Sequence, residues 1–194
     1  MNFLAHLYLS GSDPGIRLGN FIGDFVKGKQ YLNYPEPIQT GILLHRTIDA
    51  FTDSHPVVHQ SMQHFREQYR RYSGVVTDLM YDHFLAANWH RYSQQSLADY
   101  VTDINRMLMR NYFKLPNEVK GFLPFLVKSR RLETYQTLGG IERSLTIMTN
   151  HSSLPHHVDF AMQQLEVHYS ELQNEFFTFF EDVRLMAENE RRKE

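Results

Sequence analysis

The sequence predicts an all-α protein that folds as a single compact domain of several helices. Helix caps and helix breakers recur along the whole chain, whereas the alternating runs that mark strands are nearly absent. The 194 residues have the length of one domain, and 42% of them are hydrophobic, enough for a substantial core. Aromatic residues reach 13%, so we expect the helices to pack around large, rigid side chains.

The first three predicted helices are set by turn and cap signals. Residues 1–10 are mostly apolar and end at the loop GSDPG, which predicts a buried first helix. Asp13 and Pro14 form an N-cap and first-turn pair, so a second helix should follow and close near Gly28. A loop bracketed by two prolines then leads into a third helix that runs to about Ser54.

The middle of the chain predicts three more helices. A proline begins the fourth, over residues 56–74, and the fifth covers residues 75–92. Ser96 caps the sixth, with Asp99 in the position of a capping box, and this helix continues to about Phe113.

The last third predicts helices with interruptions. A shorter helix should be interrupted by Gly121 and Pro124, and the pair Gly139-Gly140 should separate two others. Pro155 opens a long final helix, whose charged tail over residues 188–194 is expected to fray. No repeat, linker or shift in composition divides residues 1–194, so a single domain is expected.

Charge and composition exclude several classes of function. The net charge of −2 provides no global field for a nucleic acid or an anionic membrane. The absence of cysteine excludes disulfides, thiolate metal sites and cysteine nucleophiles. The apolar N-terminal stretch is too short to span a bilayer and lacks a basic leader. We therefore expect a cytoplasmic protein without nucleic-acid or membrane partners; the sequence carries no signal for an oligomeric state.

Two polar residues interrupt apolar runs near the N-terminus. His6 lies within FLAHLYL and Asp24 within FIGDFV, so both should be partly buried. A buried carboxylate is costly unless it is neutralised, paired or bound to a metal. For either residue alone, a hydrogen-bonded core histidine or a paired aspartate is the more frequent explanation, and a metal ligand is the alternative.

The segment GILLHRTIDAFTDSHP carries a stronger pattern. His45 and Asp49 are four residues apart and therefore share one helix face, with Arg46 beside them. Such a pair can supply a nitrogen and an oxygen to one divalent ion. The alternatives are an aspartate that fixes a histidine tautomer and a surface ion-pair face.

The segment TDLMYDHFLAANWH repeats this spacing. Asp78 and Asp82 share a helix face, and two such carboxylates repel each other unless a cation lies between them. The mixture of imidazole and carboxylate groups from several helices suits Mn, Mg or Fe better than structural Zn. The complete candidate set comprises His6, Asp24, His45, Asp49, Asp78, Asp82 and His83.

Basic residues form two clusters along the chain. In a nearly neutral protein such clusters are usually solvated faces, but they could also dock an acidic protein. The clusters are Arg66, Arg70 and Arg71, and Lys128, Arg130 and Arg131.

Four ordered motifs together resemble one known family. MNFLAHLYLS, GNFIGDFVKG, GILLHRTIDAFTDSHP and YDHFLAANW are similar to the acyl carrier protein phosphodiesterases, also called holo-acyl-carrier-protein hydrolases. The resemblance runs nearly the full chain and is strongest over residues 1–90. That family looks like a divergent branch of the helical, metal-dependent HD phosphohydrolases. This chain departs from the usual HD pattern because it has no adjacent His-Asp pair; its nearest equivalents are the reversed Asp82-His83 and the spaced His45 and Asp49.

The resemblance implies an activity and a partner. The expected reaction is hydrolysis of the phosphodiester that joins 4'-phosphopantetheine to a serine of acyl carrier protein, with a divalent metal, Mn first. The expected metal ligands are Asp24, His45, Asp82, His6, Asp49 and Asp78. The expected catalytic residues are Asp24, His45, Asp82, His83 as the acid for the serine oxygen, and Arg46, or else Lys27, for charge on the phosphate.

Two alternative functions compete with this expectation. The first is an HD-like phosphohydrolase that acts on a nucleotide or another small phosphoester and needs no protein-docking surface. The second is a helical binding protein without catalytic activity, whose acids and histidines form structural pairs and hold no metal.

Overall fold

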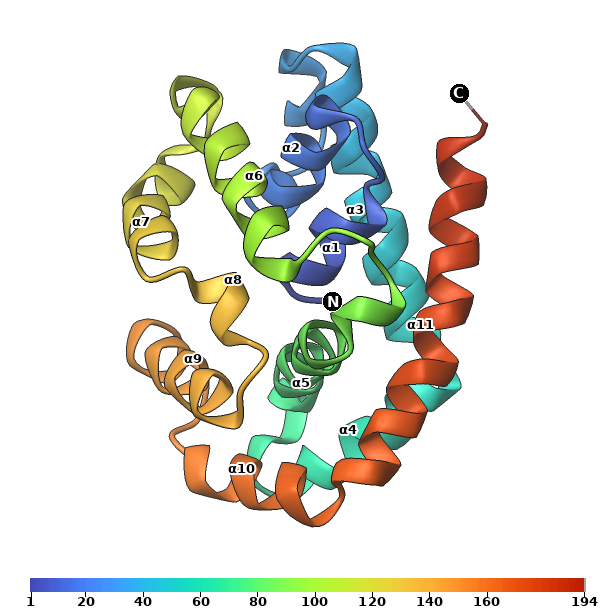
Figure 1. Ribbon diagram of the computed structural model, residues 1–194, viewed down its shortest axis with the longest axis vertical. Coiled ribbons are helices and arrows are strands. Elements are labelled where there is room, and N and C mark those ends of the chain that lie inside the picture. Colours follow the sequence, from blue (N-terminus) through green and yellow to red (C-terminus); the bar gives the residue numbers. More distant parts are fainter. Residues whose placement is uncertain (194) are drawn as a thin grey trace.

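The computed structural model describes residues 1–193, and over this range the chain forms α-helices and short 3-10 turns with no strand (Figure 1). The all-α prediction is therefore confirmed. The helices are α1 Phe3–Leu9, α2 Pro14–Ile22, α3 Glu36–Ser54, α4 Pro56–Tyr69, α5 Ser73–Ala87, α6 Leu97–Arg110, α7 Asn117–Lys128, α8 Arg131–Thr134, α9 Leu138–His151, α10 Val158–Val167 and α11 Tyr169–Arg191. The 3-10 turns are η1 Gly23–Phe25, η2 Gln30–Asn33, η3 Arg70–Tyr72, η4 Trp89–Arg91 and η5 Tyr112–Lys114.

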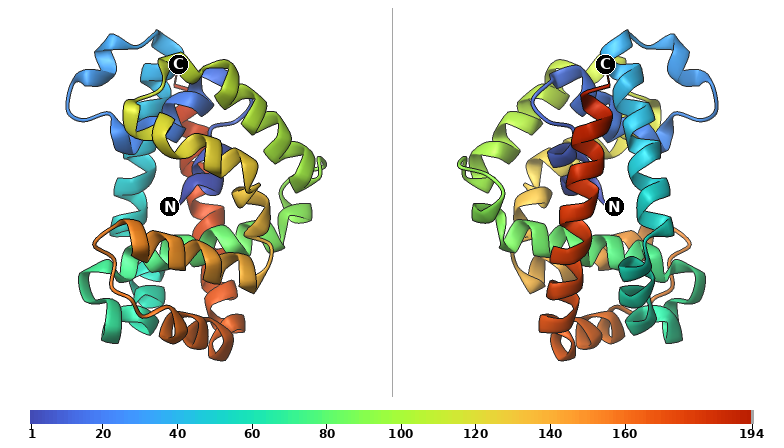
Figure 2. Two further views of the ribbon diagram at one scale, coloured as in Figure 1. Left: turned by 90° about the vertical axis from the view of Figure 1, so that its left-hand side faces the viewer. Right: turned by 90° about the vertical axis from the view of Figure 1, so that its right-hand side faces the viewer.

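The helices surround a central pair, α1 and α5. The N-terminus lies in the interior of the fold in every view, whereas α11 runs along one side of the molecule against α3 and α4 (Figures 1 and 2). The helices α6, α7 and α9 cover the opposite side, and α10 closes one end. One continuous core joins buried residues from α1 through α11. None of the helices over residues 1–193 combines the length and apolarity needed to cross a membrane.

Several predicted caps are present as hydrogen bonds. The Asp13 carboxylate accepts from the backbone N–H groups of Gly15 and Ile16 at the start of α2. The Ser96 hydroxyl accepts from the backbone N–H of Asp99 at the start of α6. These short polar side chains satisfy N–H groups that have no partner within the helix, and so they fix where each helix begins.

Two predicted interruptions are wrong. Helix α7 continues through Gly121 and Pro124, because Leu123 and Leu126 are buried on one face and hold the segment against the core. The pair Gly139-Gly140 lies inside the first turn of α9 and does not separate two helices. Gly140 is needed there because a Cβ atom would lie 1.9 Å from the Thr134 carbonyl oxygen.

The prediction of one long final helix is also wrong, because this segment is divided into α10 and α11 at His168. The break lets α10 close the end of the fold while α11 packs along its side (Figure 1). Helix α11 includes the first part of the charged tail and continues to Arg191, whose guanidinium donates to the Leu9 carbonyl. Fraying of the tail over residues 188–194 stays a prediction. Residue 194 lies outside the described residues.

A close crossing of α2 and α3 positions the candidate site. A Cβ atom on Gly19 would lie 2.1 Å from the Ile38 carbonyl oxygen, and one on Gly41 would lie 2.2 Å from that of Ile16. Only glycine allows the two backbones to approach this closely. The crossing brings Asn20 of α2 against His45 of α3, whose Nδ1 atom lies 2.8 Å from the Asn20 carbonyl oxygen.

We expect Gly19→Ala to lower the free energy of unfolding by about 1–3 kcal/mol, because the added methyl group overpacks the crossing. Gly121→Ala is the matched control, since nothing lies within 4 Å of a Cβ atom there, and it should stabilise the protein by about 0.4–1 kcal/mol. Urea unfolding followed by circular dichroism measures both changes. Equal changes for the two variants would show that the crossing is not tightly packed.

Candidate metal centre

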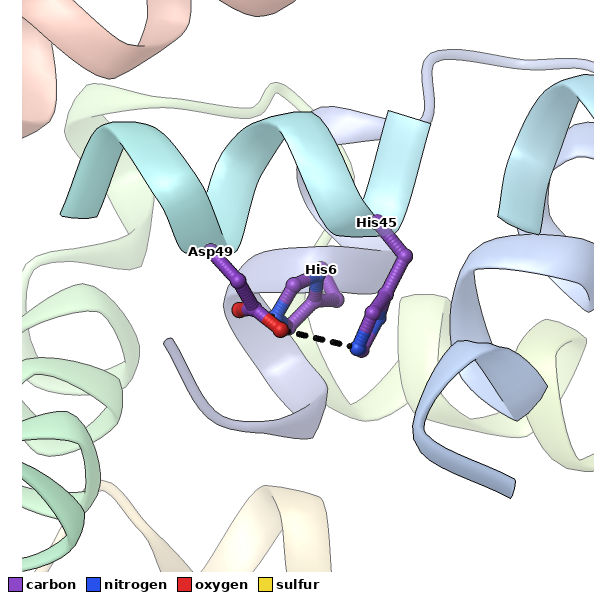
Figure 3. A group of neighbouring side chains, drawn as sticks. All are labelled: His6, His45 and Asp49. Atoms are coloured by element: carbon purple, nitrogen blue, oxygen red, sulfur yellow. Dashed lines mark ion pairs between the residues drawn. The ribbon is translucent and has the colours of Figure 1, made fainter. Parts of the chain in front are cut away.

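Three helical segments bring four of the predicted ligands together. His6 comes from α1, His45 and Asp49 from adjacent turns of α3, and Asp24 from the 3-10 turn η1 that follows α2. Figure 3 shows the His45 and Asp49 side chains pointing from α3 toward His6. The predicted four-residue spacing thus places both α3 groups on the face that meets α1.

The nitrogen and oxygen atoms of this group lie close together. The Nε2 atom of His45 is 3.1 Å from Asp49 Oδ2 and 3.3 Å from Asp24 Oδ1. The Nε2 atom of His6 is 3.2 Å from Asp49 Oδ1, and the two imidazole rings stack with centroids 4.1 Å apart. Both histidines are buried, whereas the side chains of Asp49 and Asp24 are 37% and 65% exposed. The group is therefore open to solvent on its carboxylate side.

Asn20 fixes which nitrogen of each ring carries the proton in the neutral form. Its backbone carbonyl lies 2.8 Å from His45 Nδ1, and its side-chain oxygen lies 2.7 Å from His6 Nδ1. The Asn20 amide nitrogen donates to the His6 carbonyl, which turns the amide oxygen toward the His6 ring. These oxygens can only accept, so each Nδ1 atom donates, and a neutral ring then presents a lone pair at Nε2. Sequence reasoning missed Asn20, although it is a polar residue within the apolar run GNFIGDFV.

The geometry of these atoms fits a shared divalent ion. Both Nε2 atoms are buried and have no hydrogen-bond partner within residues 1–193, although carboxylate oxygens lie 3.1 to 3.3 Å away. Ligands bound at about 2.0–2.2 Å to one ion lie roughly 2.8–3.6 Å from one another. His6, His45 and Asp49 could therefore hold a metal ion, with Asp24 as an additional ligand on the open side.

The charges of the group favour a cation at its centre. Burial alone would lower the pKa of His45, but Asp24 and Asp49 outweigh it and raise this pKa to about 9. Burial lowers the pKa of His6 to about 4, against the attraction of Asp49. Burial would raise the pKa of Asp49, but His45 and His6 lower it instead, and the His45 imidazole 3.3 Å away lowers the pKa of Asp24. At neutral pH two carboxylates thus face one protonated and one neutral imidazole.

The predicted ligands of α5 lie beside the start of α1 and outside this group. The Asp82 carboxylate is fully buried and accepts from the backbone N–H groups of Leu4, at 2.9 Å, and Ala5, at 3.0 Å. Burial raises the pKa of Asp82 to about 7 against these two hydrogen bonds. Asp78 lies 3.2 Å from the α-ammonium of Met1, which is 3.8 Å from Asp49. Both acids hold the N-terminal segment, and their role as metal ligands stays a prediction.

The remaining predicted catalytic residues have other partners. His83 Nδ1 donates to the Tyr135 carbonyl at 2.8 Å, and its Nε2 lies 3.0 Å from the Tyr169 hydroxyl. Arg46 donates to the backbone carbonyls of Val26 and Gly28 and so fixes the loop after η1. The structure does not bring either residue among the candidate ligand atoms, and their catalytic roles stay predictions.

A second group of histidines was not expected from the sequence. His64 Nε2 lies 3.9 Å from Glu171 Oε2, and His168 Nδ1 lies 3.1 Å from the same oxygen. The three residues could also hold an ion, but Glu171 is exposed. No sequence spacing could reveal this group, because α4 and α11 meet only in the folded protein.

Comparisons with known proteins agree across the whole chain. The sequence profile of a family described as acyl carrier protein phosphodiesterase matches residues 1–183. The chain is 32% identical to an acyl carrier protein phosphodiesterase of Yersinia pestis and 33% identical to one of Klebsiella pneumoniae (strain 342), each over 97% of this chain and 98% of the relative. A protein of the same name from Salmonella agona (strain SL483) is 31% identical over 99% of both chains. No solved structure gives a significant match.

We expect Asn20→Ala to lower the affinity for Mn²⁺ by about 10- to 100-fold, because His6 loses the acceptor that orients its ring. Asn105→Ala is the control, since it removes another buried asparagine that lies outside the group. Calorimetric titration of each folded variant with Mn²⁺ gives the two affinities. Tight binding by Asn20→Ala would show that the side chain does not support the site.

The affinity for Mn²⁺ should rise with pH by about tenfold per unit from pH 6.5 to 8.5, because the ion must displace the proton of His45. Titration in buffers of different ionisation enthalpy should detect about one proton released per ion. In the metal-free protein the raised pKa has the opposite effect on stability. The stability that protonated His45 adds to the folded protein is fully present below about pH 6.5 and is lost as the pH rises through about 9. An affinity that is constant over this range would exclude His45 as a ligand.

Proposed function

The chain belongs to the acyl carrier protein phosphodiesterase family, and from this premise we propose that it releases 4'-phosphopantetheine from the serine of holo-acyl carrier protein in a reaction that requires a divalent metal. The observation that carries the proposal is the group of His6, His45 and Asp49, with Asp24 on its open side. It lies within the residues that the family profile matches. Mn²⁺ is the ion we propose first, because its preference for nitrogen and oxygen ligands suits this group.

The residues of the group have distinct parts in the proposed reaction. A bound divalent ion supplies Lewis acidity toward the phosphoryl oxygens and lowers the pKa of a coordinated water. His6 and His45 present their Nε2 atoms to that ion, held in place by Asn20. Asp24 is the most exposed member of the group, and this exposure supports a role as acceptor of the proton from the attacking water. As the new bond between water oxygen and phosphorus forms, the bond to the serine oxygen would break, and that oxygen would receive the proton that Asp24 accepted from the water.

The location of the basic clusters bears on how the carrier protein would dock. Arg66, Arg70 and Arg71 line a shared hollow on α4 and η3 together with Glu67, and their excess of positive charge would favour an acidic partner. In the other cluster Arg130 is already paired with Glu133 at 2.5 Å. We therefore propose the first cluster as the stronger docking surface. The expected cytoplasmic location and the likeness to HD phosphohydrolases stay predictions.

The test is an assay of holo-acyl carrier protein with Mn²⁺, in which mass spectrometry detects loss of the arm. The wild-type protein should release 4'-phosphopantetheine, and a chelator should abolish the release. His45→Ala should lower the rate by more than about 100-fold, because a ligand is lost. His90→Ala should retain the rate, because His90 is exposed and lies outside the candidate centre.

A second substrate separates the alternatives. If bis(p-nitrophenyl) phosphate is hydrolysed as efficiently as the carrier protein, the small-phosphoester function is the better description, because remote binding energy then contributes nothing. If the wild-type protein neither binds Mn²⁺ nor releases the arm, the helical binding protein without catalytic activity is favoured.

A further inference from the structure

An apolar groove begins at the candidate metal centre. It has a volume of about 960 Å³, and Asp24 is one of its lining residues. From there it passes between α7 and α9, with walls that are mostly aromatic or aliphatic. The principal apolar residues are Phe3, Phe25, Phe122, Phe125 and Met148. Because Asp24 belongs to both, the groove and the metal centre are continuous.

One cationic side chain in this groove lacks a partner. Of the described residues that line the groove, Arg131 is the one arginine or lysine, and carboxylates are contributed by Asp24 and Glu118. The Nη2 atom of Arg131 is buried and has no hydrogen-bond partner, and no ion pair involving Arg131 occurs over residues 1–193. Its guanidinium carbon lies 5.7 Å from the centre of the Phe125 ring.

An unpaired guanidinium in such a place is suited to binding an anion. Leaving a buried donor of a charged group unsatisfied is costly, and the planar guanidinium matches a phosphate or a carboxylate in particular. The neighbouring Arg130, by contrast, forms an ion pair with Glu133. An anion bound in the groove would supply hydrogen-bond acceptors for the Arg131 guanidinium.

We propose that this groove is the binding site for the 4'-phosphopantetheine arm, with Arg131 bound to the phosphate oxygens and the aromatic walls packed against the pantetheine chain. The proposal rests on the function proposed above. The arm consists of one phosphate and a long, weakly polar chain, and the groove combines one arginine with mostly apolar walls. Arg131 thereby takes the phosphate-binding role that the sequence suggested for Arg46, which is occupied by the carbonyls of Val26 and Gly28.

The experiment measures binding of 4'-phosphopantetheine and of pantetheine, which lacks the phosphate, to the Mn²⁺-loaded protein by calorimetry. Arg131→Gln should lower the affinity for 4'-phosphopantetheine by about 10- to 100-fold and leave the affinity for pantetheine unchanged. Arg131→Lys should show a smaller loss, because it keeps the charge without the planar donor pair. Arg143→Ala, an exposed arginine of α9 that does not line the groove, should change neither affinity.

A second pair of variants tests the apolar wall. Phe125 is 51% exposed and lines the groove, whereas Phe113 is 92% exposed and does not. Phe125→Ala should lower the affinity for both ligands several-fold, because each contains the pantetheine chain. Phe113→Ala should alter neither. Circular dichroism and the melting temperature confirm that every variant is folded.

The outcomes separate this proposal from the function on which it rests. If the wild-type protein hydrolyses holo-acyl carrier protein while Arg131→Gln and Phe125→Ala bind both ligands normally, the groove is not the arm site and the function stands. If the wild-type protein releases no arm, but the affinity for 4'-phosphopantetheine still falls in Arg131→Gln, the proposed function fails and the binding site stands. A loss in Arg143→Ala equal to that in Arg131→Gln would overturn the specific role of Arg131.

Discussion

The candidate site depends on the close crossing of α2 and α3 at Gly19 and Gly41. Because no side chain separates the two backbones there, Asn20 can offer its carbonyl to His45 and its side chain to His6. Both rings are thereby held in one orientation, with their Nε2 atoms toward carboxylate oxygens. Lone pairs and carboxylates cannot face each other in a buried place without a cation between them, so the packing of two helices creates a demand for a proton or a metal ion.

The acids of α5 contribute to this arrangement from a second direction. Asp82 accepts from two backbone N–H groups at the start of α1, as a capping residue from another helix would. Asp78 pairs with the α-ammonium of Met1. The short helix α1 is thus anchored at its first turn, and its position decides where His6 lies. Burying the Asp82 carboxylate has a cost in stability, and the benefit is a fixed location for one ligand.

The exposure of the carboxylates in the candidate metal centre indicates what kind of site it is. The histidines are buried, whereas both carboxylates are partly exposed, and Asp24 also lines the groove that contains Arg131. A site that only stabilised the fold would gain nothing from an open side that leads into a groove. The arrangement suits a long phosphodiester that enters along the groove and presents its phosphate at the centre. It is harder to reconcile with a purely structural set of ion pairs.

The sequence by itself determined the helical class, most of the helix starts and the pairing of His45 with Asp49. Caps, prolines and a four-residue spacing act within one helix, and neighbouring residues suffice to decide them. The motifs over residues 1–90 also identified the family, whose profile matches residues 1–183.

Only the tertiary structure decided which polar residues meet across helices. Asn20 supports two histidines, Asp82 caps α1, and Arg131 lines the groove, although none of these roles follows from local spacing. Tertiary packing also decided the helix breaks that were wrongly predicted. Helix α7 continues through Pro124 because its leucines are buried against the core. A helix period specifies which residues share a face, but the partner opposite that face depends on how distant helices pack, and that is settled by the whole core at once.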